Sequence, residues 1–252
     1  MRVQELFETS DEDRALISLS SVIYAKIKEH IGTERDLVSL GKVRELADTP
    51  LIALNEISID IMGGEAFLRR LHDIPPEDVL KDDLKSAVAF WDEDADAVVF
   101  NRDFLETERM RTTVTHELRH ALDSVKANKF PGDAKRYFTA KKKEHRKDDP
   151  YSTTKYRAQP AEINARFTEV LHQLSVIIPK RYKLVEPHLL RQQLTRDFNN
   201  LLIKYEIADL FPEKTKSPAY KRLIKRAYDF IQKEMAHIES LPDTTKRASG
   251  NW

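Results

Sequence analysis

The most constraining feature of the sequence is the run from Thr112 to Asp123, in which two histidines stand four residues apart. In a helix, side chains four positions apart project from the same face, about one turn from each other. His116 and His120 would therefore lie side by side, with Glu117 next to the first of them. Apolar residues at helical spacing lie roughly opposite this pair: Val114, Leu118, Ala121, Leu122 and Val125. The run therefore predicts an amphipathic helix that packs one face on a core and presents two imidazoles on the other.

Two imidazoles at this spacing can bind one Zn²⁺ at about 2.0–2.1 Å from each nitrogen. Glu117 would then contact a water on the metal rather than the metal itself. A carboxylate in that place can take the proton of the water and later pass it to a leaving amine. The alternative is a pair of surface histidines on a solvated helix face. Since the chain has no cysteine, His, Asp and Glu must supply any metal ligand.

Composition narrows the class of protein. Hydrophobic residues make up 40% of the chain and charged residues 33%, which is typical of a soluble protein. The formal net charge of +0 argues against a general nucleic-acid binder. The N-terminal residues are charged and lack an apolar signal core, and no apolar run reaches the roughly 18 residues of a membrane span. We therefore expect a cytoplasmic protein that neither crosses a membrane nor is secreted by the usual signal.

The first half of the chain predicts helices around a small sheet. A helix is expected to begin at Ser10, before three acidic residues, and to end near Gly32, and a weaker helix is expected over 37–47. The alternation of Ile57, Ile59 and Ile61 with polar residues predicts a strand with one buried face. A short helix over 66–71 should follow.

Next, the apolar runs 88–91 and 97–100 flank an acidic turn and predict a hairpin. Thr107 can cap a helix that continues to about Lys126. Residues 127–158 are loop-like, because they combine proline and glycine with a dense set of charges.

From Pro160 onward the pattern is helical, and four prolines divide it into roughly three helices: Pro179, Pro187, Pro212 and Pro218. The predicted fold class is α+β, with a small, mainly antiparallel sheet, the helix of the two histidines and a helical C-terminal half. We expect a single domain over 1–241, made of an α/β part (1–126), a basic loop (127–158) and a helical part (159–241). The tail 242–252 should be disordered.

The stretch from Ala97 to about Lys126 resembles the active-site region of the HExxH zincin metallopeptidases. The resemblance implies a zincin-like fold, a zinc cofactor and hydrolysis of peptide bonds in a peptide or protein substrate. In that family a sheet precedes the helix, and its edge strand binds the substrate by main-chain hydrogen bonds. Ala97–Phe100 is in the right place for that role, although it could equally be a plain core strand.

Glu162 is the expected third zinc ligand. The glutamate-ligand zincins take this ligand from a later helix, and the pattern Pro-x-Glu-x-x-x-Arg at 160–166 is similar to one downstream of HExxH in some phage-encoded and prophage zincin-like proteins. Arg166 lies four residues after Glu162 and could pair with it and orient it. The alternative is a glutamate that only stabilises the first turn of its helix.

Asp123 is the main rival to Glu162. It lies about 10 Å along the helix axis from His116, so a direct bond to the metal would have to reach back. A hydrogen bond to His120 from outside the ligand set is easier, and an exposed carboxylate is easier still. The chain also lacks the glycine that leads to a third histidine in the metzincins, which counts against that subgroup. His145 is a weaker possibility, and His172 is expected on a helix surface.

Two further features complete the predicted site. A tyrosine commonly stabilises the oxyanion in this family, and Tyr156, or else Tyr151, is near enough to Glu162 in sequence for that role; packing of the loop is the alternative for both. Basic residues crowd the segment 126–147, which is a solvated loop, a lid over the cleft or a contact for an acidic partner or nucleic acid. Apart from that segment we expect no nucleic-acid binding.

Two other classes of function stay open. A zincin-shaped binding protein without turnover, associated with a virion if the chain is phage-encoded, would have no need of Glu117 as a base. A metal-dependent hydrolase of a non-peptide substrate would use the same zinc and water chemistry on another bond.

Overall fold

The computed structural model describes residues 10–32, 35–72, 87–107, 109–129, 160–211 and 217–241. It divides into two compact units, one formed by Ala15–Asp148 and the other by Met1–Arg14 with Asp149–Trp252. The first helix, α1 (Ser10–Lys28), contributes residues to both units. No helix among the described residues is both long enough and apolar enough to cross a membrane. The α+β class is confirmed, with a small sheet in the first unit and three long helices in the second.

The sheet of the first unit has the strand order β1 (Leu37–Lys42), β2 (Ser58–Met62), β4 (Ala97–Asn101) and β3 (Ala89–Asp92). β1 pairs with β2 and β3 with β4 in antiparallel fashion, whereas β2 and β4 are parallel. The sheet is therefore mixed rather than mainly antiparallel. The predicted hairpin and the strand of alternating isoleucines are confirmed.

The central place of β4 corrects one expectation. Ala97–Phe100 was expected to be either a substrate-binding edge strand or a plain core strand; β4 lies between β2 and β3 with all its residues buried, so the core strand is confirmed and the edge strand is wrong. Its apolar residues therefore serve the core on both faces. In the part of the chain that the structure describes, the edges of the sheet are β1 and β3.

A second correction concerns residues 37–47, which were predicted to be helical. The structure has β1 there, followed by a helix of only one turn, α2 (Val43–Leu46). Gly41 has φ +100°, and the register with β2 shifts beside it. Glycine adopts this left-handed conformation at low cost, and the conformation is incompatible with a continuous α-helix. Pairing with β2 instead provides hydrogen-bond partners for the backbone N–H and C=O groups of β1.

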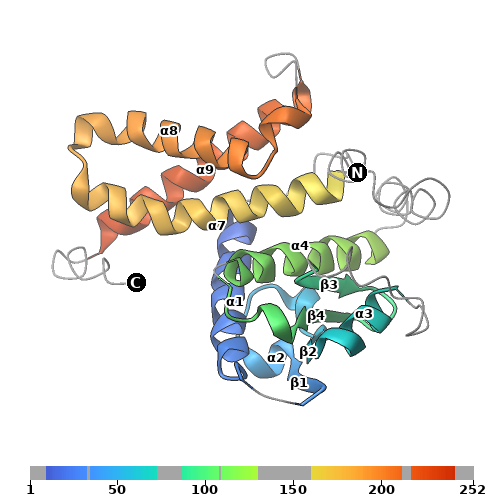
Figure 1. Cartoon of the computed structure of the whole chain (residues 1–252). Helices are drawn as coiled ribbons and strands as arrows, with labels where there is room; N and C mark the ends of the chain where they lie inside the picture. Colours follow the sequence, from blue (N-terminus) through green and yellow to red (C-terminus); the bar gives the residue numbers. More distant parts are fainter. Residues whose placement is uncertain are drawn as a thin grey trace. The chain divides into compact units, whose positions relative to one another are not determined.

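Helices cover both faces of the sheet (Figure 1). On one face, Ile59 and Ile61 of β2 join the core formed with α1 and α4 (Met110–Lys129). On the other face, Phe67 of α3 (Gly64–His72) packs against Ala97 and Val99 of β4. Successive side chains of a strand point to opposite faces, so Val98 and Phe100 of β4 belong to the first core and Ala97 and Val99 to the second.

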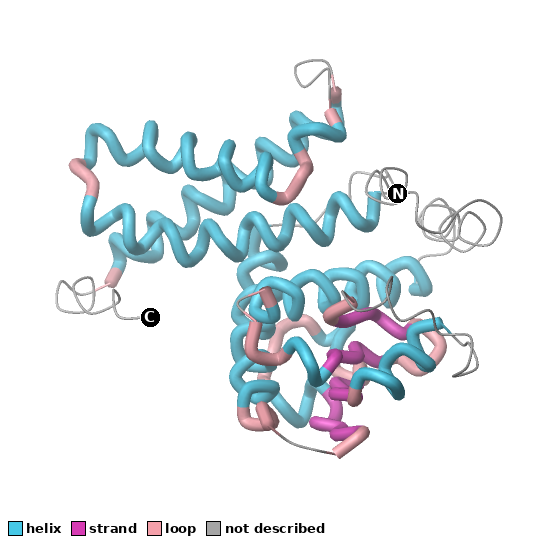
Figure 2. The backbone as a smooth tube through the Cα atoms, in the orientation of Figure 1, coloured by secondary structure: helices cyan, strands magenta, loops and turns pink. Residues whose placement is uncertain are grey.

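In the residues that the structure describes, the second unit contains three long helices, α7 (Pro160–Leu184), α8 (Pro187–Lys204) and α9 (Pro218–Ser240), drawn in cyan in Figure 2. α7 packs against both other helices. The predicted division into roughly three helices is confirmed, with helices that begin at Pro187 and Pro218. Pro212 lies outside the described residues, whereas α7 continues through Pro179. Burial of Leu174 and Ile178 on α7 outweighs the one backbone hydrogen bond that this proline removes.

A buried ion pair holds the first turn of α1 to α9 within this unit. Arg226 on α9 donates from Nε to Oδ2 of Asp13 over 2.7 Å, and the side chain of Asp13 is 0% exposed. Arg226 also donates to Oδ1 of Asn164 over 2.6 Å, and its guanidinium lies 5.2 Å from the ring centroid of Phe167. The guanidinium therefore has a carboxylate, an amide oxygen and an aromatic ring as partners, and such partners stabilise a buried charge.

Arg226→Met should lower the free energy of unfolding by about 3–5 kcal/mol, because it removes the cation from a buried ion pair. Urea unfolding followed by circular dichroism measures this loss. Lys233→Met is the matched control on the same helix, since Lys233 pairs with Asp11 at side-chain exposures of 40% and 69%. The control should cost less than about 1 kcal/mol. Equal losses in the two variants would contradict the assignment.

Candidate metal centre

Helix α4 is fixed to the first unit on its apolar side. The predicted stripe is confirmed, since Val114, Leu118, Ala121 and Leu122 are all buried in the core. Thr115 adds a buried hydrogen bond, in which its hydroxyl donates to the hydroxyl of Ser20 on α1 over 2.8 Å. Thr107 does not cap α4 as predicted, because the helix begins at Met110 and the Thr107 hydroxyl donates back to the carbonyl of Phe104. The orientation of α4 about its own axis is therefore set by packing.

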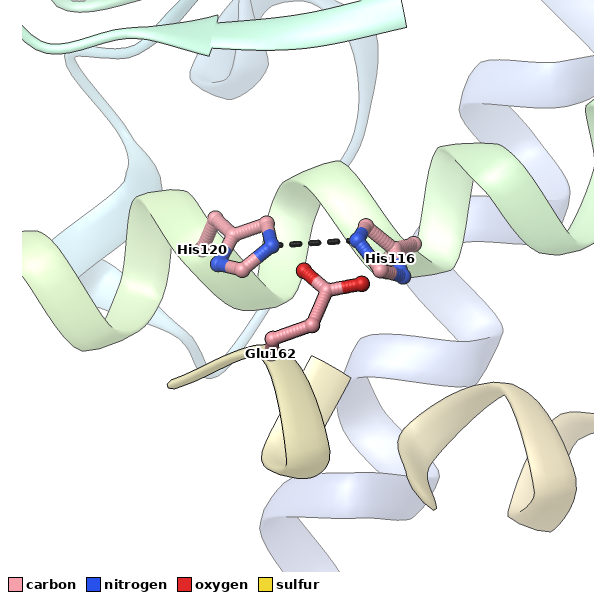
Figure 3. Close-up of side chains that lie close together, drawn as sticks. All are labelled: His116, His120 and Glu162. Atoms are coloured by element: carbon pink, nitrogen blue, oxygen red, sulfur yellow. Dashed lines mark hydrogen bonds between the residues drawn. The ribbon is translucent and has the colours of Figure 1, made fainter. Parts of the chain in front are cut away.

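This orientation places the two histidines together. The Nε2 atoms of His116 and His120 lie 3.0 Å apart, and the ring centroids are separated by 4.7 Å with 74° between the planes. His120 is 6% exposed and His116 is partly buried. The predicted pairing of the imidazoles across one helical turn is confirmed (Figure 3).

Glu162, on α7, is the third member of a group that could hold a metal ion. One ligand atom from each of His116, His120 and Glu162 lies within 4.8 Å of the other two, and the carboxylate in Figure 3 points toward the imidazole nitrogens. Two ligands held about 2.05 Å from a tetrahedral ion lie roughly 3.3 Å from each other. The 3.0 Å separation of the imidazole nitrogens is close to that value. Two neutral nitrogens and one carboxylate oxygen also form a donor set that suits Zn²⁺.

Arg166 holds the carboxylate of Glu162, as the sequence predicted. Its Nε donates to Oε1 of Glu162 over 2.7 Å, and the Glu162 side chain is only 4% exposed. Burial by itself lowers the pKa of Arg166, but the hydrogen bonds and charges of Glu162 and Glu206 outweigh it and raise that pKa above its usual value. Arg166 therefore stays positively charged beside the Glu162 carboxylate.

Glu117 is buried at 7% exposure and is not a member of the three-ligand group. Its neighbour in sequence, His116, is a member of that group.

Asp123 is bound elsewhere. Its Oδ1 lies 3.0 Å from Nε of Arg119, and the two side chains are 6% and 0% exposed. The expectation of an exposed carboxylate is therefore wrong, and the described residues give Asp123 no place in the three-ligand group. The expectation of a surface position for His172 is also wrong, because this residue is 0% exposed on α7. Tyr156, Tyr151, His145 and the basic segment after Lys129 lie outside the described residues.

Sequence reasoning missed two charged residues near this centre. Arg119 lies inside the HExxH motif and is fully buried, although arginine in such a position is expected on the surface. Glu206 contacts Arg166 from forty residues away, with 3.1 Å between Oε2 and Nη1. No local pattern could have indicated either contact, because each depends on tertiary packing.

Comparison of the chain with protein-family models, with curated proteins and with solved structures finds no match.

Proposed function

We propose that this chain is a zinc-dependent peptidase with a zincin-like fold, in which His116, His120 and Glu162 bind the metal. The observation that carries the proposal is the convergence of these three ligand atoms within 4.8 Å of one another. Three protein ligands leave a fourth position open, which distinguishes a catalytic zinc site from a closed structural one.

Zinc held by these residues would supply a Lewis acid, which would lower the pKa of a water molecule to about 7. Glu117 would accept a proton from the attacking water and deliver it to the amine that leaves when the peptide bond breaks. The burial of Glu117 keeps bulk water from competing for its carboxylate. Arg166 keeps the carboxylate of Glu162 in one orientation.

In this proposal β3, rather than Ala97–Phe100, binds the substrate along the edge of the sheet. It is the edge strand beside α4. The backbone N–H of Asn101 donates to the carbonyl of Val88. In an antiparallel ladder every second residue of a strand bonds to its neighbour, so the residues between point their backbone groups outward. The backbone groups of Ala89 and Trp91 consequently point away from β4, where an extended peptide can pair with them.

Ala89→Pro tests this role, because proline removes one outward N–H without removing a bond to β4. We expect kcat/KM for a peptide to fall roughly 5- to 20-fold, which corresponds to one hydrogen bond of about 1–1.8 kcal/mol, with zinc content unchanged. Leu37→Pro is the matched control, since the hydrogen bond from Gly63 to the carbonyl of Asp36 directs Leu37 outward on the opposite edge. A similar loss in both variants would assign the effect to general damage of the sheet.

The direct test of the proposed function is digestion of an unfolded protein by the purified, zinc-loaded chain, with products identified by mass spectrometry. We expect cleavage that a zinc chelator abolishes and that added Zn²⁺ restores. Stoichiometric zinc without cleavage of any unfolded protein would favour a binding protein, and absence of bound zinc would overturn the proposal.

A further inference from the structure

Glu206 occupies a backbone position that does not favour glutamate. It follows the C-terminal end of α8 with φ +59°, in the left-handed region. Its N–H donates to the carbonyl of Ile203, and the N–H of Ile207 donates to the carbonyl of Leu202. These two bonds form a Schellman motif, in which the residue at the position of Glu206 is usually glycine.

The charge of Glu206 is also unfavourable in this place. The C-terminal end of a helix carries a partial negative charge, which repels a carboxylate. A glutamate that meets both a steric and an electrostatic penalty indicates a compensating role for its side chain. The structure provides one, because Oε2 of Glu206 accepts from Nη1 of Arg166 over 3.1 Å.

Arg166 is therefore shared between two carboxylates. Its Nε bonds to Glu162 over 2.7 Å and its Nη1 bonds to Glu206. Nη1 also lies 3.4 Å from the backbone carbonyl of Tyr205, which fixes the guanidinium against the end of α8. The side chain of Glu206 is 43% exposed, whereas that of Glu162 is 4% exposed. The buried carboxylate and the partly exposed one thus sit on two sides of one cation.

This sharing has an electrostatic consequence for the proposed metal ligand. An arginine bonded to Glu162 alone would neutralise the carboxylate and repel a second cation beside it. A second carboxylate on the same guanidinium offsets that repulsion and leaves the three groups with a net negative charge. Partners of metal ligands commonly affect metal affinity in this way, by orienting the ligand and tuning its charge.

We propose that Glu206 is a positioning residue for the metal centre, which acts through Arg166 to keep Glu162 both oriented and sufficiently negative to bind Zn²⁺. This inference rests on the proposed function, because it takes Glu162 as a metal ligand. It adds a residue from the end of another helix that touches neither metal nor substrate.

The experiment compares two variants that both lack the carboxylate, Glu206→Gln and Glu206→Gly. Zinc affinity is measured by competition with a chromophoric chelator, and thermal stability is measured on the metal-free protein. Both variants should bind Zn²⁺ roughly tenfold more weakly than the wild type, at the lower end of the 10–100-fold that such partners typically contribute. Glu206→Gly should nevertheless melt about 2–4 °C above Glu206→Gln, because glycine relieves the left-handed backbone.

If Glu206 had only a structural role, zinc affinity would rise with the thermal stability of the metal-free protein. The glycine variant would then bind Zn²⁺ more tightly than the glutamine variant. That result overturns the inference, and so does an unchanged affinity in Glu206→Gln. Asp197→Asn is the matched control, because Asp197 pairs with Arg181 over 2.7 Å in the same unit. The control should keep the affinity of the wild type.

A double-mutant cycle provides a second readout. In an Arg166→Gln background, Glu206→Gln should change zinc affinity by less than about twofold, because its route to Glu162 has been removed. An equal effect in both backgrounds overturns the inference. Failure of the wild type to bind zinc at all would instead refute the proposed function, so the two failures are distinguishable.

Discussion

Glu117→Gln should lower kcat for peptide hydrolysis by about 10²–10⁴-fold, the range that general acid–base catalysis contributes. Glutamine has nearly the same shape as glutamate but cannot accept the proton of the water. Since Glu117 is not a member of the three-ligand group, zinc content should stay at one equivalent per chain. The measurement pairs initial rates on a quenched fluorescent peptide with metal analysis of the same protein sample.

The control for this prediction is Glu169→Gln, because Glu169 is buried to almost the same degree, at 8% against 7% for Glu117. It should keep most of the activity. A comparable loss in this control would mean that any uncharged replacement of a buried glutamate disturbs the protein. Undiminished activity in Glu117→Gln would remove the base from the proposed mechanism and favour another route for the proton.

Local patterns sufficed for the parts of the fold that depend on short-range order. α4 is confirmed because its apolar stripe and its two histidines repeat at the helical period over the whole segment. The hairpin of β3 and β4 is confirmed because two apolar runs flank a short acidic turn. The pair of Glu162 and Arg166 is confirmed because residues four apart on a helix are neighbours.

The features that the sequence could not supply all depend on pairing between distant segments. The parallel pairing of β2 with β4 makes β4 central, yet its residues alone are equally consistent with an edge strand. Residues 37–42 have apolar residues at a spacing that both helix and strand permit. The segment forms a strand because it pairs with β2, and that pairing cannot be predicted from residues 37–42 alone. Burial of Arg119 likewise depends on what surrounds α4 in three dimensions.

The largest effect on metal binding is expected from His116→Ala and Glu162→Ala, each of which removes a proposed ligand atom. Zinc affinity should fall by more than about 100-fold, beyond the 10–100-fold that outer partners typically contribute. The Glu162 variant should remain folded, because Arg166 keeps Glu206 as its second carboxylate partner. Isothermal titration of the metal-free proteins with Zn²⁺, together with thermal unfolding, separates loss of a ligand from loss of the fold.

Asp123→Asn supplies the decisive comparison, because Asp123 was the rival for the third ligand position. Its carboxylate pairs with Arg119 over 3.0 Å, and both side chains are buried. Loss of that pair should destabilise the fold by about 3–5 kcal/mol, since it removes the charge of one partner from a buried ion pair. Zinc affinity of the folded fraction should nevertheless stay within about threefold of the wild type, because the expected ligands remain. Zinc binding that survives in Glu162→Ala and disappears in Asp123→Asn would transfer the third ligand to α4 and separate Glu162 from the metal.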